Sequence, residues 1–194
     1  MKVVYLKKSS SKGYLRLGVE VDGDARSYTL SEREYRELSS LKCGDNLTRV
    51  ELSALEECDM RYRALRFALS SLSLCDSSKR NLYMKLTARK ISKEIAALTV
   101  NEVVRLGYLN EERQIENIAI SLNEREKMGR YKITRRLLSK GYSQGDINRA
   151  ICRLISEEKI DFEATRAELL AKYPDDLSDE EKRKILYKNG YVNV

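Results

Sequence analysis

The feature that most constrains the fold is an internal repeat with a period of 51 residues. Asp59, Asn110 and Asp161 are residue types that favour helix N-caps, and they are separated by that interval. Phe67, Ile118 and Leu169 each follow eight positions later. Further positions repeat at the same distance: Leu82 with Ile133, Leu86 with Leu137, and Ser92 with Ser143. Matched caps and apolar positions at a period near fifty indicate tandem helical units.

Each unit is predicted to hold three helices, bounded by cap residues and glycine breaks. Asp76 and Ser92 are the expected caps inside the first unit. The expected helices are 60–73, 77–89 and 93–106, then 111–126, 130–140 and 144–156, then 162–173 and 179–188. We therefore predict helical repeats at 59–107 and 108–157 and an incomplete third repeat at 158–194. Three-helix bundles in tandem favour an elongated, curved array.

The first 58 residues read differently and predict a small α+β module. Strands are expected at 2–7, 14–21 and 27–30, with Asp22-Gly23 as a turn. Ser31 with Glu34, and Thr48 with Glu51, form capping-box patterns. They predict a helix from Ser31 that stops at Cys43-Gly44 and a short helix that ends near Glu57. The expected fold class is mainly α, with this α+β module at the N-terminus.

The net charge of +7 is concentrated in the middle of the chain. Residues 61–106 hold ten basic and three acidic side chains, and residues 107–156 hold ten and six. The flanking segments 1–60 and 157–194 are slightly acidic. Such a surplus favours a polyanion or an acidic protein surface as the partner, over an ordinary solvated helix face.

Several functional classes are disfavoured by the composition. The chain has no His, and its four cysteines (Cys43, Cys58, Cys75 and Cys152) are far apart, which argues against a zinc site and favours reduced, partly buried thiols. No phosphate-binding loop, dinucleotide fingerprint or nucleophile elbow occurs. We therefore expect no enzyme activity, cofactor or metal. The acidic segment 174–181 lacks the spacing of a calcium loop and reads as a capped helix start.

The absence of a long apolar run predicts a soluble, cytoplasmic protein. No stretch approaches the ~20 apolar residues that a membrane-spanning helix needs. The apolar run after Met1 is too short for the core of a signal peptide.

Four segments in order resemble the RecX family. Leu106–Glu112 (LGYLNEE) is similar to the family's LGYLDDE segment, and 127–143 is similar to its xxGxxxIxxELxxKGIS stretch. Ala64–Ala68 resembles ALRYL, and Leu82–Leu86 resembles ELxxKL. Together they span roughly 60–156. The chain departs from the family where Asn110 replaces an Asp and where Arg135-Arg136 replaces a more acidic pair.

The resemblance implies a regulator of recombination, DNA repair and the SOS response. Its expected partner is the RecA–single-stranded DNA filament, whose ATP hydrolysis and strand exchange it would modulate, most often by inhibition. Single-stranded DNA is the expected nucleic-acid partner, with double-stranded DNA as a second candidate, and the chain is expected to be a monomer.

The candidate RecA- or DNA-binding residues are the cations of the two complete repeats. They are Arg63, Arg66, Lys79, Arg80, Lys85, Arg89 and Lys90, then Arg130, Lys132, Arg135, Arg136 and Lys140. Tyr62, Tyr83 and Tyr131 lie among them and could stack on bases, although half-buried structural tyrosines are the preferred interpretation. Two alternatives stay open: a sequence-independent DNA-binding protein built of helix-turn-helix-like units, and a purely structural scaffold.

Overall fold

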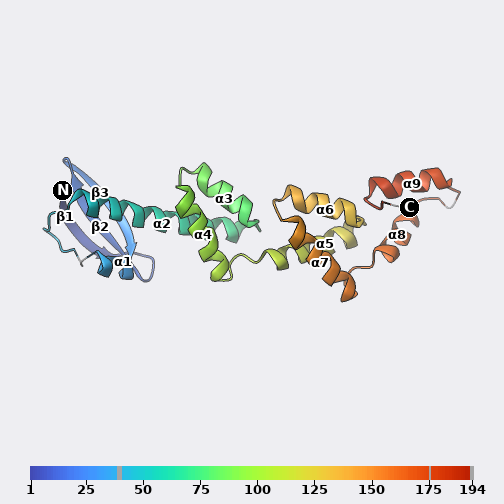
Figure 1. Ribbon diagram of the computed structural model, residues 1–194, viewed down its shortest axis with the longest axis horizontal. Coiled ribbons are helices and arrows are strands. Elements are labelled where there is room, and N and C mark those ends of the chain that lie inside the picture. The colour runs from blue at the N-terminus through green and yellow to red at the C-terminus, as the bar shows by residue number, and fades with distance from the viewer. Residues whose placement is uncertain (39–40, 175, 193–194) are drawn as a thin grey trace. The chain divides into compact units, whose positions relative to one another are not determined.

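The computed structural model describes residues 1–38, 41–174 and 176–192 and confirms a mainly helical fold with a small N-terminal sheet (Figure 1). The strands are β1 (Lys2–Lys8), β2 (Tyr14–Val21) and β3 (Asp24–Ser31). The helices are α1 (Glu32–Glu37), α2 (Arg49–Leu74), α3 (Lys79–Ala88), α4 (Lys93–Arg105), α5 (Glu111–Glu126), α6 (Arg130–Ser139), α7 (Gln144–Ser156), α8 (Phe162–Leu170) and α9 (Asp179–Lys188).

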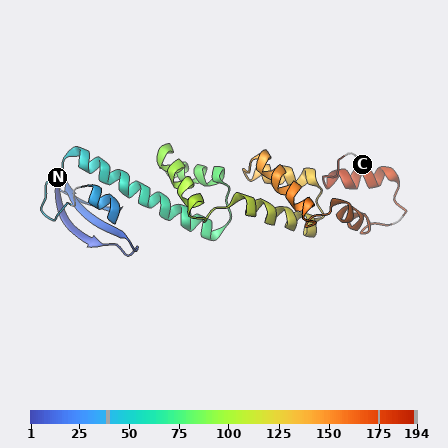
Figure 2. The same cartoon turned by 60° about the horizontal axis from the view of Figure 1, so that its bottom comes forward.

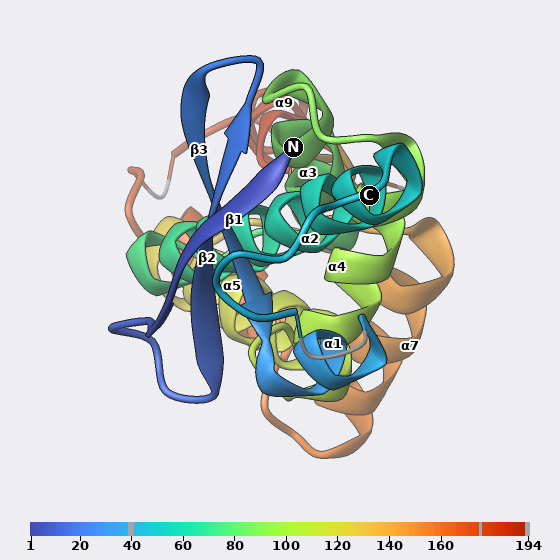
Figure 3. The same ribbon diagram turned by 90° about the vertical axis from the view of Figure 1, so that its left-hand side faces the viewer.

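The N-terminal sheet is an antiparallel meander of order β1-β2-β3. Asp22 and Gly23 both have positive φ, as a two-residue hairpin turn between β2 and β3 requires. Apolar side chains of the three strands form one buried cluster with Leu55 and Cys58 of α2. Helix α2 consequently covers the apolar face of the sheet (Figure 3).

Helix α1 is shorter than the capping pattern predicted. Ser31 and Glu34 form the expected capping box, but the helix ends at Glu37 rather than near Cys43. Residues 39–40 of the expected helix lie outside the described residues. Tyr35 donates a hydrogen bond to the carbonyl of Leu41 at 2.9 Å, and Leu41 is buried in the sheet cluster. Burial of Leu41 requires the chain to turn back early, which ends the helix.

Helix α2 continues past the helix end predicted near Glu57. Thr48 and Glu51 form the expected capping box, but the helix runs on through Asp59 to Leu74 instead of stopping near Glu57. Asp59 is not an N-cap. Its buried carboxylate accepts the backbone N–H of Thr29 at 2.9 Å and pairs with Arg63 at 2.6 Å. The Asp59 carboxylate therefore accepts an amide of the edge strand β3, and not an amide at the start of a helix.

The chain divides into two compact units. One comprises 1–71 and 85–103, and the other comprises 72–84 and 104–194. In the first, Ala64 and Ala68 of α2 and Val103 of α4 are fully buried. In the second, α5, α6 and α7 enclose a continuous apolar core that includes Ile115, Ile133, Leu137, Ile147, Ile151 and Leu154.

The repeat of 51 residues recurs in the helices themselves. Helix α6 begins 51 residues after α3, and α7 begins 51 residues after α4. Asn110 and Asp161 are N-caps as predicted, and the hydroxyls of Ser92 and Ser143 each accept an amide at the start of a helix. In the first repeat, however, Ser78 rather than Asp76 accepts the capping amide, from Asn81.

The C-terminal part holds α8 and α9 (Figure 2). Helix α8 ends at Leu170 instead of Tyr173, since the residue before a proline disfavours helical geometry. The acidic segment 174–181 leads into α9, where Ser178 and Glu181 form a capping box; residue 175 lies outside the described residues. Over the described parts of the chain, no helix combines the length and apolar character needed to cross a membrane.

Candidate nucleic-acid interface

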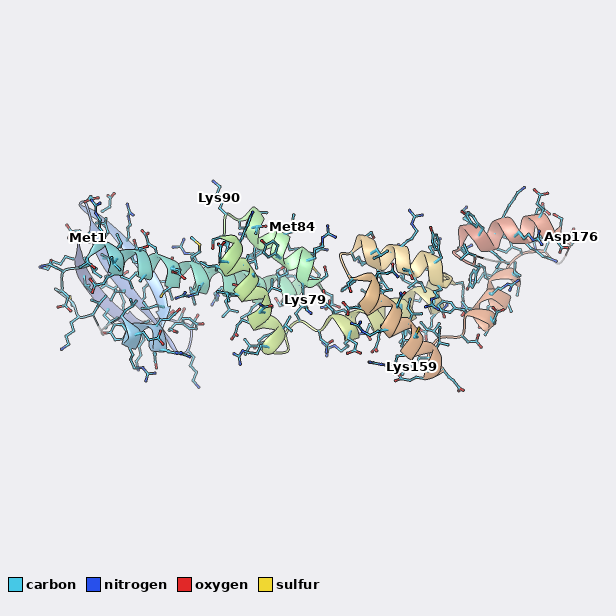
Figure 4. All side chains as sticks on the ribbon, viewed as in Figure 1. Met1, Lys79, Met84, Lys90, Lys159 and Asp176 are labelled. Carbon is cyan, nitrogen blue, oxygen red and sulfur yellow. The ribbon has the colours of Figure 1, made fainter. Side chains whose placement is uncertain are left out.

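Ten of the twelve candidate cations are exposed, and Lys85 and Lys132 are half-buried. They lie on α2, α3 and α6 and in the turns that follow α3 and α6. Lys90 has a positive φ in the turn after α3 and extends away from the ribbon (Figure 4). These positions keep most of the predicted set accessible to a large anionic partner.

Three of these cations are paired with carboxylates. Arg63 pairs with Asp59 and Lys79 with Glu111, at 2.6 and 3.4 Å. One nitrogen of Arg136 reaches both oxygens of Glu126, at 2.8 and 2.9 Å. Their charge is largely compensated within the protein, so they contribute less to the attraction of a polyanion than the sequence suggested.

Other members of the set contact neutral groups and keep their charge uncompensated by those contacts. In the first unit, Arg66 donates to the Ser11 hydroxyl at 3.1 Å, and the Arg89 guanidinium lies 4.1 Å from the centre of the Phe67 ring. Lys85 donates to the Ser71 hydroxyl at 3.3 Å. In the second unit, Arg130 contacts the Cys152 sulfur at 3.7 Å, and Arg135 lies over Tyr131. Such contacts orient a cation without neutralising it.

A junction within the second unit brings cations of both sets together. The carbonyl of Lys140 accepts hydrogen bonds from the Ser78 hydroxyl and the Asn81 amide, each at 2.9 Å. Gly141 follows with a φ of 84°, and a Cβ there would lie 2.8 Å from the Ser78 hydroxyl. The start of α3, which carries Lys79 and Arg80, is thereby held against the end of α6, which carries Lys140.

A buried hydrogen-bond chain through Tyr142, Gln114 and Asp76 lies next to this junction. Tyr142 is buried and donates its hydroxyl proton to the side-chain carbonyl of Gln114 at 2.9 Å. Gln114 in turn donates to Asp76 at 3.2 Å. Burial, followed by the nearby Asp76 and Glu111 carboxylates, raises the pKa of Tyr142 to about 12. Asp76, which does not cap α3, therefore ties the segment just before α3 to α5.

The tyrosines depart in part from the half-buried role preferred for them. Tyr62 fits it: the side chain is half-buried, hydrogen-bonds the Ser11 hydroxyl and packs against Tyr14. Tyr83 is also half-buried. Tyr131 does not fit, because its side chain is 48% exposed on α6. Tyr187 of α9, which lies outside the basic middle of the chain and is not among the predicted candidates, is 72% exposed and lines a cleft together with Tyr131.

The cysteines are also more accessible than expected. Only Cys58 is buried, and burial raises the pKa of its thiol. The other three thiols, those of Cys43, Cys75 and Cys152, are exposed and free. Among the residues with described positions, no three Cys, Asp or Glu side chains gather as a metal site.

Comparison with known proteins finds two sequence relatives, although no protein-family model matches the chain. The regulatory protein RecX of Lactobacillus gasseri is 26% identical over 159 residues, which cover 81% of this chain and 58% of the relative. The regulatory protein RecX of Clostridioides difficile strain 630 is 29% identical over 153 residues, covering 77% of this chain and 68% of the relative. The chain thus spans less than two thirds of the first relative's length.

Two solved structures share the fold. A crystal structure of regulatory protein RecX superposes with a TM-score of 0.70 at 16% identity, covering 97% of this chain and 93% of that one. The crystal structure of RecX from Lactobacillus salivarius has a TM-score of 0.58 at 19% identity, covering 70% and 90%. At these identities the superpositions establish the fold alone. In sequence as well as in fold, the chain is therefore similar to regulatory proteins of the RecX family.

Proposed function

We propose that this protein binds the RecA–single-stranded DNA filament in the cytoplasm, as a monomer, and inhibits its ATP hydrolysis and strand exchange. The observation that carries the proposal is the group of cations around the junction of α3 and α6. Arg80 and Lys140 are exposed there, and the backbone that carries them is held by the hydrogen bonds to the Lys140 carbonyl. Arg135 is exposed on the same helix as this junction, α6. Fixed cations of this kind suit a partner whose phosphates or carboxylates repeat along its length.

The repeats supply the rest of the proposed binding mode. The predicted repeats 59–107, 108–157 and 158–194 would each contact the filament, with α3 and α6 as equivalent contact helices. Helix α2 joins the N-terminal module to the first of these units without interruption.

The decisive experiment measures the DNA-dependent ATP hydrolysis of RecA while this protein is titrated at two salt concentrations. The test variant is Arg130→Gln with Arg135→Gln, since both guanidinium groups contact neutral partners. The matched control is Arg149→Gln with Arg153→Gln, because Arg149 pairs with Asp146 and Arg153 with Glu112 and Glu116. We expect inhibition below one copy per RecA subunit, strongly weakened in the test variant and retained in the control.

The alternative is a DNA-binding protein that acts without RecA. In that case ATP hydrolysis would fall only as free DNA is sequestered, and excess DNA would restore it. For direct phosphate contacts, removal of two cations should lower the salt slope of binding to single-stranded DNA by roughly 1.4. Inhibition that persists with excess DNA supports the filament, whereas inhibition that disappears supports the alternative.

A further inference from the structure

Helices α6 and α9 line a cleft whose tyrosines the proposed function does not use. Its volume is about 280 Å³. It is lined by Tyr131, Lys132 and Arg135 from α6 and by Tyr187, Lys188 and Gly190 from the end of α9. All six residues belong to the second compact unit. The lining therefore consists of two aromatic rings, three cations and one glycine backbone.

The backbone fixes this cleft. Helix α6 begins at Gly129 without a side-chain cap, and carbonyls that follow α9 take that role. The Gly129 amide donates to the Asn189 carbonyl at 2.8 Å, and the Tyr131 amide donates to the Gly190 carbonyl at 3.2 Å. The nearby Tyr191 ring is buried, and its hydroxyl donates to the Lys127 carbonyl at 3.3 Å. The two helix ends are consequently held in one position.

The glycines at this contact leave no room for side chains. A Cβ on Gly129 would lie 2.5 Å from the Gly190 carbonyl oxygen, and a Cβ on Gly190 would lie 2.4 Å from that of Lys132. Gly190 also has a φ of 85°, which disfavours other residues. The close approach of these two backbones brings the lining residues of α6 and α9 into one cleft.

The side chains of the cleft have the chemistry of a nucleotide site. Tyr131 and Tyr187 are 48% and 72% exposed, more than core tyrosines would be. The Arg135 guanidinium lies 5.9 Å from the centre of the Tyr131 ring. Exposed rings stack on unpaired bases, and adjacent cations attract the phosphates that join them. An acidic peptide would use the cations but would make no use of the exposed Tyr187 ring.

We propose that this cleft binds an unpaired nucleotide of single-stranded DNA. The base stacks on Tyr131 or Tyr187, and the neighbouring phosphates lie beside Lys132, Arg135 and Lys188. The inference rests on the proposed function only for the choice of DNA over RNA.

The test measures binding of the full chain to a fluorescent oligo-dT strand by anisotropy, without RecA. The variants are Tyr187→Ala and Tyr131→Ala, with Tyr187→Phe to keep the ring. Tyr108→Ala is the matched control, since Tyr108 is 60% exposed and does not line the cleft. An abasic strand of equal length supplies the phosphates without bases, and an oligo-rU strand reports on RNA.

We expect the change to alanine at the tyrosine that stacks on the base to weaken oligo-dT binding by roughly fivefold to a hundredfold, the range for loss of one stacking ring. Tyr187→Phe and Tyr108→Ala should bind like the parent. On the abasic strand the parent should bind more weakly, and the alanine variants should match it. Because Tyr187 is largely exposed, its variant should keep the helical circular dichroism of the parent.

Three results would overturn the inference. The first is equal affinity of the parent for oligo-dT and for the abasic strand, which would mean that phosphates alone are bound. The second is no effect of either alanine variant, or no binding by the parent at low salt. The third is equal competition by poly-glutamate, which would point to an acidic protein surface. None of them depends on RecA, so the ATP hydrolysis assay could still support the proposed function.

Discussion

Replacing Gly129 by alanine tests whether the contact between α6 and the segment after α9 stabilises the protein. The added Cβ would meet only backbone: the Gly190 carbonyl oxygen at 2.5 Å, its carbon at 2.6 Å and the Tyr191 nitrogen at 2.9 Å. Carbon atoms in favourable contact lie about 3.5–4.0 Å apart. The two segments must therefore separate by about 1 Å, and no flexible side chain can absorb the shift.

That separation breaks the two backbone hydrogen bonds of the contact, which have lengths of 2.8 and 3.2 Å. Each contributes about 0.5–1.5 kcal/mol net, so the variant should lose about 1–3 kcal/mol. Alanine is also a poorer N-cap than glycine, which adds a few tenths of a kcal/mol at most sites. Partial exposure of the buried Tyr191 ring would increase the loss.

Gly145→Ala is the matched control, because the same chemical change there has the opposite expected sign. Gly145 lies in the first turn of α7, and its added Cβ would make only ordinary contacts, at 3.7 Å or more. Alanine in a helix is favoured over glycine by up to about 1 kcal/mol. Urea unfolding should thus show Gly129→Ala below the parent and Gly145→Ala at or above it. Hydrogen exchange should quicken in α9 of the first variant alone. Equal midpoints for Gly129→Ala and the parent would refute the reasoning.

Three further predictions follow from buried polar groups. Asp59→Ala should cost about 1–3 kcal/mol in urea unfolding, because it leaves the buried Thr29 amide without an acceptor, whereas Asp59→Asn should cost less; equal losses would contradict this account. Burial raises the pKa of Tyr142 and of Tyr191 to about 12, so stability should be intact below pH 10 and fall between pH 10 and about 12, as the unfolded tyrosines ionise first. Tyr142→Phe should reduce that fall, and an unchanged alkaline profile would count against it. A thiol reagent should modify three cysteines of the folded protein quickly and Cys58 only on unfolding; fast reaction of all four would be inconsistent with its burial.

Local signals predicted the repeat well. The bounds 111–126 and 144–156 and the caps Asn110 and Ser143 agree with the structure. A cap acts on amides two or three residues away, and the apolar stripe of a helix has a period of under four residues. These patterns are therefore complete within short stretches of sequence, and their recurrence at 51 residues strengthened each of them.

Asp59 shows where the same reasoning fails. Its type and spacing matched those of Asn110 and Asp161, yet it lies inside α2 and serves β3. A carboxylate satisfies any nearby N–H donor, and the sequence does not say which donor that is. The Thr29 amide of the edge strand becomes that donor only when the sheet packs on α2.

The candidate cations divide in a similar way. Their number and exposure followed from the sequence, because long charged side chains stay in solvent. Which of them are neutralised did not follow from the sequence. Arg136 pairs with the Glu126 carboxylate, whereas the adjacent Arg135 lies over the neutral Tyr131 ring. That difference depends on which face of α6 meets the end of α5.

The sequence by itself determined the helical repeat, its caps and the basic character of its middle, because these depend on interactions between near neighbours. Tertiary structure alone decided the junction at Lys140 and the cleft between α6 and α9. Each joins groups about 60 residues apart: the Ser78 hydroxyl donates to the Lys140 carbonyl, and the Gly129 amide donates to the Asn189 carbonyl. The glycines that allow these approaches look like ordinary helix breaks in the sequence. Only the tertiary structure shows that other groups of the chain occupy the space in which a side chain at Gly129 or Gly141 would lie.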